Sequence, residues 1–575
     1  MSRRQRLVFD KVGWKRSFIG ASILLTVVLV ASCGSSEGTA LNSSTTVSTT
    51  TTLAPQQTQI TYAAPYLPTN FNPNTPAGDL TVTRQIMTNI WPSVFYENSK
   101  FETVLNSSFV SSAELVSTNP EVIIYQINPQ AQWSDGVPIS ASDFVYNWMA
   151  QSGDPQNTDL GGYPYLHNST IGYSDIKSVT GSNGGKTVTI IFKKYFSEWE
   201  HLFNPIVPAH IATEVGWNLG FAIPSSNVEV SGGPYQISAY VPGQQIDLTR
   251  NPKYWGKAAT IPKLVFLEDP NPQNYAAQFQ NGTINLVDSP ANNILYSGLK
   301  SLPTVKTKLV SSLTTEELIF NLSKTPLSDS KLRQAIALAI DRKSITSYAI
   351  GSYDSAAQPA GNNVYPPGVP QYQDNSGKYF RSDPKAAAAL LTSDGYVRSS
   401  NGVMTKGGQP LVLTISVDSS NQQLLDVEEM IVQDLSAIGI VVNPVNYQLS
   451  NLEETILNHG AFDMAIVTQS GSADAAFHVS QYISAAAGSL DNYSGYSSSA
   501  ANALIAKAAT ELDPGSSAAI YNQLDQLLWK DLPSLPLYSV PDVLAFSSGY
   551  NFIGASSRSS TIFWNSSTWS FITPK

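Results

Sequence analysis

From residue 59 onward, the chain shows short runs of apolar residues and stretches with helical spacing. Apolar runs and apolar–polar alternation predict strands at 59–63, 122–127, 176–180, 186–192, 236–240, 245–250, 440–442 and 463–468. Apolar residues three and four positions apart predict helices that begin near 140 or span 329–345, 383–391, 424–438 and 516–531. Strands and helices mix without strict alternation, so we expect an α/β fold with mixed sheets.

The first 33 residues follow a different pattern. Six basic residues between Arg3 and Arg16 precede an uncharged apolar stretch at 17–31. This layout is typical of a secretory signal peptide. The stretch is shorter than the roughly 20 residues that span a bilayer, so an uncleaved membrane anchor is the weaker alternative.

Cys33 follows this stretch and is the only cysteine in the sequence. Its position directly after an apolar residue and two small ones resembles the lipobox of bacterial lipoproteins, in which the cysteine carries a diacylglycerol and becomes the new N-terminus. Residues 34–57 are mostly Ser, Thr, Gly and Ala, with too few apolar groups to repay the entropy of ordering. We therefore expect a signal peptide over 1–33, lipid on Cys33, and a flexible tether over 34–57.

Composition and charge narrow the classes of function. The chain is 42% hydrophobic and 10% aromatic, which is typical of a globular protein. The roughly 515 residues after the tether are too many for one core, so we expect two or three lobes. A net charge of −10 and a pI near 5.1 argue against nucleic acid as a partner, because phosphate contacts need basic surfaces.

Three sequence patterns could indicate an enzyme, and none of them holds. Residues 34–38 fit the G-x-S-x-G string of a nucleophile elbow but lie in the tether, where no strand-to-helix turn is expected. Residues 181–187 resemble a phosphate-binding loop, yet they are one residue short and lead into a strand, so we interpret them as a hairpin tip. The histidines include no pair at zinc-ligand spacing. We expect no enzyme, no catalytic residue, no cofactor and no metal site.

Several segments in a fixed order carry a resemblance to a known family. Residues 132–146 read QWSDGVPISASDFVY, and GGPY at 232–235, PG at 242–243 and RNPKYW at 250–255 follow. The helical segment 332–342 reads LRQAIALAIDR. Together they resemble the family 5 extracellular solute-binding proteins of ABC importers, the oligopeptide- and dipeptide-binding type. The first segment is most similar to a subgroup from high-GC Gram-positive bacteria.

The resemblance implies a periplasmic-binding-protein-like fold of type II, with two α/β lobes around a cleft and a small third domain. The first lobe would comprise 58–93, 226–322 and 536–575. The small domain would comprise 94–225, and the second lobe 323–535. The chain would cross twice between the lobes and form a two-stranded hinge, and a ligand touching both lobes would stabilise the closed form.

The implied function is that of the substrate-binding component of an ABC importer, anchored by lipid to the extracellular face of the cell membrane. Such a monomer would capture peptides or a similar polar solute and deliver the ligand to a permease that works with ATPase subunits. The alternative is a lipoprotein of the same fold that acts in cell-envelope assembly or signalling without transport.

Candidate ligand-binding residues follow from the same resemblance. In peptide-binding members, a strand and loop of the second lobe bind the peptide backbone, and an aspartate pairs with the peptide's amino group, because a buried ammonium needs a partner. The matching residues are Val467, Thr468, Gln469 and Ser470, and Ser470 takes the place of that aspartate. Asp474 could replace the anchor or simply cap the loop. The ligand could therefore be a different peptide class, a sugar, a glycolipid headgroup or another polar solute.

Three aromatic residues near the implied lobe boundaries are further candidates. Tyr538 lies where family members present an aromatic side chain to the ligand, and Trp91 and Tyr96 lie near the first boundary. Packing in the core is the alternative for each of them, because aromatic side chains dominate protein cores.

Overall fold

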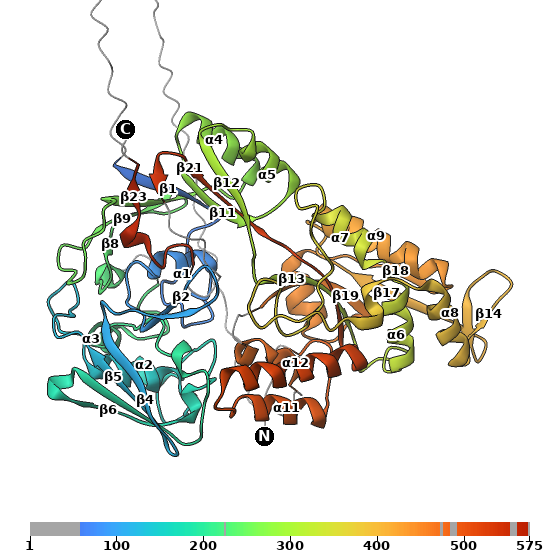
Figure 1. The fold of residues 1–575 in the computed structure, drawn as a ribbon, viewed down its shortest axis with the longest axis horizontal. Helices are drawn as coiled ribbons and strands as arrows, with labels where there is room; N and C mark the ends of the chain where they lie inside the picture. Colours follow the sequence, from blue (N-terminus) through green and yellow to red (C-terminus); the bar gives the residue numbers. More distant parts are fainter. Residues whose placement is uncertain (1–57, 223–225, 472–474, 484–491, 552–560, 573–575) are drawn as a thin grey trace, which may run out of the picture. The chain divides into compact units, whose positions relative to one another are not determined.

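The computed structural model describes residues 58–222, 226–471, 475–483, 492–551 and 561–572 (Figure 1). Gln57–Lys575 form one compact unit. The predicted signal peptide, the lipid-attachment residue Cys33 and the tether lie outside the described residues. Within the described part, no helix combines the length and the apolar character needed to cross a membrane.

A seven-stranded mixed sheet, the first sheet, contains β1 (Gln59–Ala64) near its middle. β1 pairs in parallel with β10 (Lys263–Glu268). Because successive side chains of a strand point to opposite faces, Tyr62 faces helix α1 (Thr81–Met87), and Ala63 packs with helices α4 (Tyr275–Asn281) and α5 (Asn293–Lys300). The other strands are β8 (Tyr235–Val241), β9 (Gln245–Arg250), β11 (Leu286–Pro290), β12 (Val305–Val310) and β21 (Asp542–Ser547).

A smaller four-stranded antiparallel sheet packs against the same core. Its strand order is β4 (Val110–Thr118), β5 (Glu121–Ile127), β7 (Thr187–Phe192) and β6 (Ile176–Ser182). Helix α2 (Ala141–Gln151) begins at a capping box formed by Ser140 and Asp143 and packs on this sheet. Asn183–Gly185 turn between β6 and β7, so the string that resembles a phosphate loop is a hairpin tip, as predicted.

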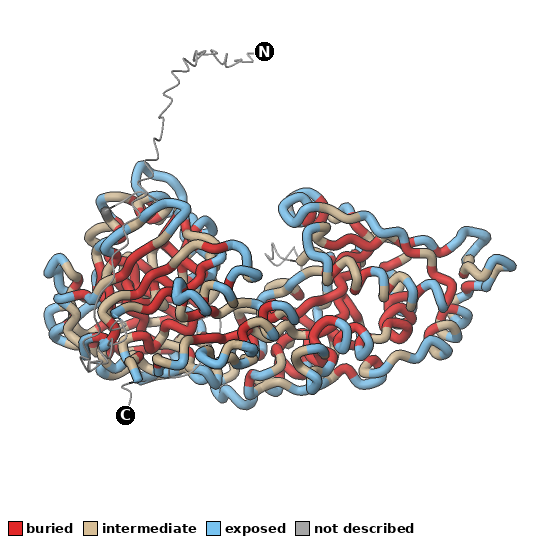
Figure 2. The backbone as a smooth tube through the Cα atoms, turned by 90° about the horizontal axis from the view of Figure 1, so that it is seen from above, coloured by how far each residue is buried: buried red, intermediate tan, exposed pale blue. Residues whose placement is uncertain are grey.

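A second main sheet has five strands in the order β18 (Val441–Pro444), β17 (Val412–Ser416), β19 (Met464–Ser470), β13 (Thr314–Phe320) and β20 (Ser534–Ser539). Buried residues run through both main sheets (Figure 2). The surrounding helices are α6 (Ser330–Ala339), α7 (Arg342–Ala349), α8 (Pro384–Ser393), α9 (Gln422–Ala437), α11 (Ser499–Ala508) and α12 (Pro514–Asp531).

The chain passes between the two main sheets twice. Residues 311–313 connect β12 to β13, and residues 540–541 connect β20 to β21. The two connections are bonded to each other, because Ser312 Oγ donates to the Val540 carbonyl oxygen and Val540 N donates to the Thr314 carbonyl oxygen at 3.0 Å. The two sheets are therefore joined by one two-stranded ribbon.

Two details differ from the sequence-based expectations. The helix predicted at 329–345 is two helices, because Asp341 caps α7 by accepting a hydrogen bond from Ser344 N, and the chain turns there. The predicted lobe boundaries at 322 and 536 assign β13 and most of β20 to the first lobe, yet both strands pair in the second sheet. Pairing between strands more than a hundred residues apart has no local sequence signal.

Arg342, in the motif at 332–342, binds three separate parts of the chain. It is 1% exposed. Its guanidinium donates to the carbonyl oxygens of Ala360 at 2.6 Å, Tyr379 at 2.7 Å and Pro536 at 2.9 Å. It also lies 5.0 Å from the ring centre of Trp529, a favourable cation–π distance. A planar group with five donors can bind all three carbonyls, so Arg342 ties two loops and β20 to helix α7.

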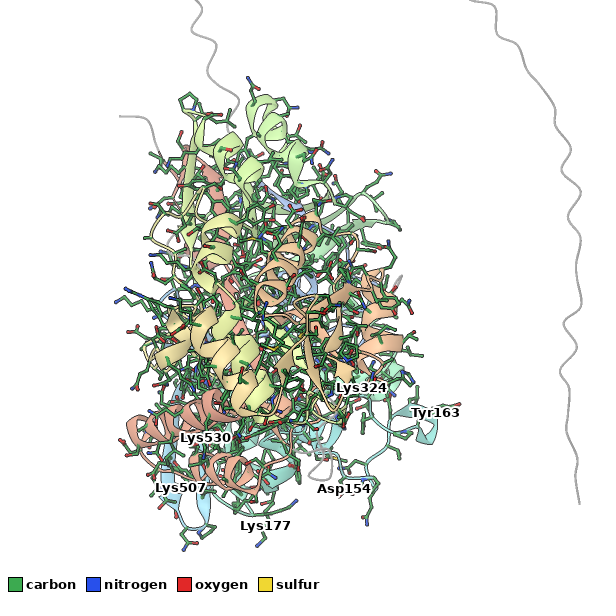
Figure 3. All side chains as sticks on the ribbon, turned by 90° about the vertical axis from the view of Figure 1, so that its right-hand side faces the viewer. Asp154, Tyr163, Lys177, Lys324, Lys507 and Lys530 are labelled. Atoms are coloured by element: carbon green, nitrogen blue, oxygen red, sulfur yellow. The ribbon has the colours of Figure 1, made fainter. Side chains whose placement is uncertain are left out.

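Charged side chains make up 13% of the chain, and Lys177, Lys507 and Lys530 illustrate those exposed at the surface (Figure 3). Glu316 and Glu317 in β13 and Asp525 in α12 are buried instead. Burial raises the pKa of Glu316 and of Asp525 to about 7, and that of Glu317 to about 8. Transfer into the protein interior disfavours the ionised form of each.

Gly233, in the segment GGPY, lies where two chain segments touch. A β-carbon at this position would lie 2.2 Å from the carbonyl oxygen of Asn89. We therefore expect Gly233→Ala to lower the free energy of unfolding by about 1–3 kcal/mol, because the main chain must shift. The matched control is Gly298→Ala in helix α5, where the nearest atom would be 3.4 Å away. This control should be neutral or stabilising in urea titrations. Equal stability of the two variants would contradict the prediction.

Candidate functional site

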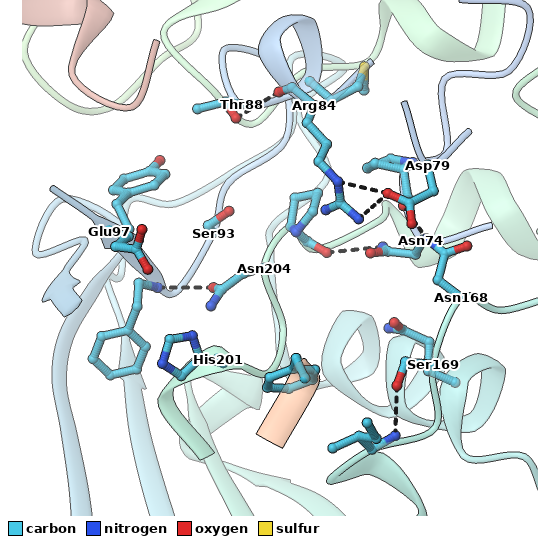
Figure 4. Close-up of a pocket in the computed structure, with 18 of the residues that line it drawn as sticks. Asn74, Asp79, Arg84, Thr88, Ser93, Glu97, Asn168, Ser169, His201 and Asn204 are labelled. Atoms are coloured by element: carbon cyan, nitrogen blue, oxygen red, sulfur yellow. Dashed lines mark hydrogen bonds and ion pairs between the residues drawn. The ribbon is translucent and has the colours of Figure 1, made fainter. Parts of the chain in front are cut away.

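A pocket of about 600 Å³ has helix α1, strand β2 (Phe95–Glu97) and residues 200–205 on one side and the end of β19 on the other (Figure 4). Residues 73–103 and 151–205 form one wall, the first wall. The second wall is formed by Leu313, Ser470, Gly471, Phe477 and Ser480. The volume falls within the roughly 300–1,000 Å³ typical of small-molecule sites.

Hydrogen bonds hold the segments of the first wall together. Asn204 joins two of them, because its Oδ1 accepts from Phe95 N at 3.0 Å and its Nδ2 donates to the Glu200 carbonyl oxygen at 3.0 Å. Asn168 Nδ2 donates to the Pro73 carbonyl oxygen at 2.7 Å. Polar groups on this wall are therefore positioned before a ligand arrives, which lowers the entropy lost on binding.

The second wall follows directly from strand β19. Ser470 ends this strand, and Gly471 N donates to the Leu313 carbonyl oxygen at 2.7 Å. The Phe477 ring lies 6.1 Å, centre to centre, from the His201 ring of the first wall. Polar groups near the end of a strand of the second sheet thus face a pocket whose other wall is formed by residues 73–103 and 151–205.

Three carboxylates and one guanidinium line the pocket. Arg84 is paired with Asp79, since its Nε donates to Asp79 Oδ1 at 2.9 Å and its Nη2 donates to the same oxygen. Figure 4 shows Glu97 on the opposite side of the view from this pair. Burial raises the pKa of the third carboxyl, Glu200, and nearby His201 lowers it in part. Glu97 and Glu200 thus place two further carboxyl groups on the first wall.

Two of the ligand-binding candidates predicted from sequence line the pocket. Ser470 does so from the second wall and Tyr96, half-buried, from the first. Thr468 instead donates its hydroxyl hydrogen to Glu316, and the Gln469 amide donates to Gln481 Oε1 at 3.0 Å. The remaining strand candidate packs in the interior: Val467 contacts a small core cluster. Asp474 lies outside the described residues.

The other two aromatic candidates are completely buried and do not line the pocket. Tyr538 belongs to the core of the second sheet, where its hydroxyl accepts a hydrogen bond from Gln423 at 3.2 Å. Trp91 packs edge-on against Phe221 at 5.0 Å and donates to the Val230 carbonyl oxygen. The structure places both of them in core packing, the alternative considered for every aromatic candidate.

The charged residues of the first wall were not anticipated from the sequence. Arg84, Asp79 and Glu200 belong to no recognisable motif. Asp79 and Arg84 pair locally, whereas only long-range contacts bring Glu200 to the same pocket. Glu97 offered the one local signal, because it ends a run of apolar and aromatic residues. Among the residues described, no three His, Cys, Asp or Glu side chains lie close enough together to hold a metal ion.

Comparison with known proteins gives consistent matches along the chain. The model of a family described as bacterial extracellular solute-binding proteins, family 5 Middle, matches residues 106–515. The oligopeptide-binding protein OppA of Mycobacterium tuberculosis is 29% identical over 498 residues, which cover 85% of this chain and 81% of OppA. A probable monoacyl phosphatidylinositol tetramannoside-binding protein of the same species, LpqW, is 24% identical over 78% of this chain and 74% of its own length.

The same fold occurs among solved structures. The periplasmic EDTA-binding protein EppA superimposes with a TM-score of 0.82 and 26% sequence identity, covering 90% of this chain and 97% of EppA. The two main mixed sheets with the smaller sheet beside them are thus the type II binding-protein architecture that the sequence predicted.

Proposed function

Because this chain belongs to the bacterial extracellular solute-binding proteins of family 5, we propose that it is the substrate-binding component of an ABC importer. Its ligand is a short peptide or a similar polar solute. The observation that carries the proposal is the pocket of about 600 Å³, which polar groups of the first wall and of the end of strand β19 line. A ligand that touches both walls stabilises the enclosed arrangement over any arrangement in which the walls part.

The chemistry of the second wall supports a ligand with hydrogen-bonding groups. Strand β19 ends at Ser470 at the pocket, as expected for a strand that presents main-chain groups to a peptide backbone. The name of the relative OppA also supports a peptide ligand. Ser470 supplies no carboxylate, so the ligand's charged groups are recognised elsewhere in the pocket.

The cellular setting of the proposal comes from the N-terminal sequence. A signal peptide, a lipid-modified Cys33 and the Ser/Thr-rich tether would hold the folded unit at the extracellular face of the membrane. There a monomer would pass its ligand to a permease and its ATPase subunits. Radiolabelled palmitate incorporated by the wild type and not by Cys33→Ala would test the anchor.

Native mass spectrometry of the tag-free protein, purified without its signal peptide from its own host, tests the ligand. We expect additional masses equal to short peptides, which disappear after denaturation. A single non-peptide mass, such as that of a glycolipid, would contradict the peptide ligand and favour a role in the cell envelope. An empty pocket that peptide libraries fail to stabilise against heat would contradict it as well.

A pocket-filling variant shows whether such a ligand occupies this site. Ser470 is exposed and lines the pocket, so Ser470→Trp should exclude the ligand while the fold persists. Ser297→Trp, on the exposed surface of helix α5, is the matched control. Ligand retained equally by both variants would place binding outside this pocket.

A further inference from the structure

Four large apolar side chains are exposed on two loops next to helix α3 (Ala209–Val215). Leu160, Tyr163, Leu166 and Leu219 are 56%, 68%, 52% and 73% exposed. Single exposed apolar residues are common, but a group of them marks a site of interaction. The surface formed by these four residues, the loop patch, shares none of them with the lining of the ligand pocket. We propose that the loop patch binds a partner protein whose facing surface combines apolar side chains with lysine or arginine.

Hydrogen bonds hold the two loops that carry the loop patch together. Asn218 Oδ1 accepts from Leu166 N at 2.8 Å, and Asn218 Nδ2 donates to the Pro164 carbonyl oxygen at 3.0 Å. The carboxylate of Asp159 accepts from Trp217 N at 2.7 Å and from Asn218 N at 2.9 Å. The four apolar side chains are therefore carried by one anchored surface, which is positioned before a partner arrives.

The same two loops bury other aromatic side chains, so poor packing does not explain the exposure of the loop patch. Trp217 is completely buried, and its indole N–H donates to the Leu166 carbonyl oxygen at 2.7 Å. Tyr165 packs edge-on against Trp217, with the ring centres 6.3 Å apart. Tyr163 instead extends outwards at the edge of the molecule (Figure 3). Exposed apolar surface is unfavourable in water, and contact with a partner protein removes it from water.

The charge of these segments indicates the kind of partner. Asp154 is exposed on the loop that leads to the first part of the loop patch, and Glu214 is exposed on α3. Helix α3 contacts the turn Leu160–Gly162. The chain has no lysine or arginine at 101–176 or 195–249, the two ranges that contain both loops and α3. Lysine or arginine beside the apolar side chains of a partner would complement these carboxylates.

The same charges disfavour two other occupants of the loop patch. Segments that bind a membrane surface combine apolar and aromatic side chains with lysine or arginine, because anionic lipids attract the positive charge. The loop patch has the apolar part and the opposite charge. In a symmetric pair with a second copy of this chain, Asp154 and Glu214 would be brought towards the same carboxylates of the other copy, which repel them.

Photo-cross-linking tests the partner in the full-length chain, expressed in its own host. Tyr163 is replaced by p-benzoylphenylalanine in one variant, and Ile294, a 66% exposed residue of α5, is replaced in the control. From position 163 and not from position 294, we expect a cross-link to one protein. Mass spectrometry should place it in a segment with apolar residues and lysine or arginine. A cross-link to lipid alone, to a second copy, to a segment without lysine or arginine, or to nothing beyond the control overturns the proposal.

A synthetic peptide that copies the cross-linked segment then measures both contributions to binding by the purified protein without its signal peptide. Leu160→Ser combined with Leu219→Ser should weaken binding at least about tenfold, because the apolar contact is lost. Asp154→Lys combined with Glu214→Lys should weaken it at least about threefold, and by less at high salt.

The matched control for charge is Glu114→Lys, because Glu114 is exposed on β4 and belongs to neither loop. All the substituted residues are exposed, and an unchanged thermal unfolding temperature shows that each variant keeps the fold. Wild-type affinity in either double variant, or equal weakening by Glu114→Lys, overturns the proposal.

Discussion

Arg342→Met should lower the free energy of unfolding by about 3–5 kcal/mol. Methionine replaces the volume of the stem, but the carbonyl oxygens of Ala360, Tyr379 and Pro536 lose their donor in a site where Arg342 is 1% exposed. A buried carbonyl without a partner costs about 1–3 kcal/mol, and the stacking on Trp529 is lost as well. Urea titration followed by tryptophan fluorescence measures the change.

Two further variants distinguish the contribution of the guanidinium's hydrogen bonds to stability from the contribution of its positive charge. Arg342→Lys keeps a cation but cannot reach three carbonyls in one plane, so it should fall between the wild type and Arg342→Met. Arg381→Ala removes an arginine that is exposed, and it should change stability by less than about 0.5 kcal/mol. A loss of less than about 1 kcal/mol in Arg342→Met would contradict the role assigned to the hydrogen bonds.

Raising the pH from 6.5 to 8.5 should lower the free energy of unfolding by roughly 4 kcal/mol. Burial raises the pKa of Glu121, Glu316 and Asp525 to about 7 and of Glu317 to about 8. In this window the unfolded chain has already released these protons, whereas the folded protein still holds part of them. The folded state therefore binds more protons, and its stability falls as the pH rises through these pKa values.

The pH range begins at 6.5 because, below this value, the titration of His478 changes the free energy of unfolding mainly in the opposite direction. Burial lowers the pKa of His478 to about 4, so its contribution to stability is lost as the pH falls from about 6.5 towards 4.

Glu317→Gln should remove about 2 kcal/mol of the fall in the free energy of unfolding between pH 6.5 and 8.5. Glu429→Gln, on the exposed surface of α9, should leave the fall unchanged. Urea titrations at both pH values measure the free energy of unfolding. An equal fall in this free energy between pH 6.5 and 8.5 for the two variants would contradict the explanation.

Local patterns predicted part of the secondary structure, including β1, β5 and α9, because the forces behind those elements are local. The capping box at Ser140 and the hairpin around Asn183 depend on residues within a few positions of one another, and both are present. The break at Asp341 was missed because the apolar spacing continues across it and hides the cap. The membership of β13 in the second sheet was missed because its partners β19 and β20 lie far away in sequence.

The pocket was predicted less completely than the fold. The family resemblance led to Ser470 because the strand before it could be aligned, and Ser470 does line the pocket. It could not lead to Glu97 or Glu200, whose proximity depends on the Phe95–Trp199 contact and on the bonds of Asn204. The completely buried Trp91 and Tyr538 show the converse, since position near a boundary does not reveal which way a side chain points.

The bond between Ser312 and Val540 also has a mechanical consequence. Two independent linkers would let the sheets shear, twist and tilt separately. Here the linkers are hydrogen-bonded to each other through Ser312, Thr314 and Val540. Displacement of one linker along the chain direction would therefore break these bonds or move the other linker as well. We therefore expect the two sheets to move relative to each other mainly by bending of this ribbon about a single hinge axis.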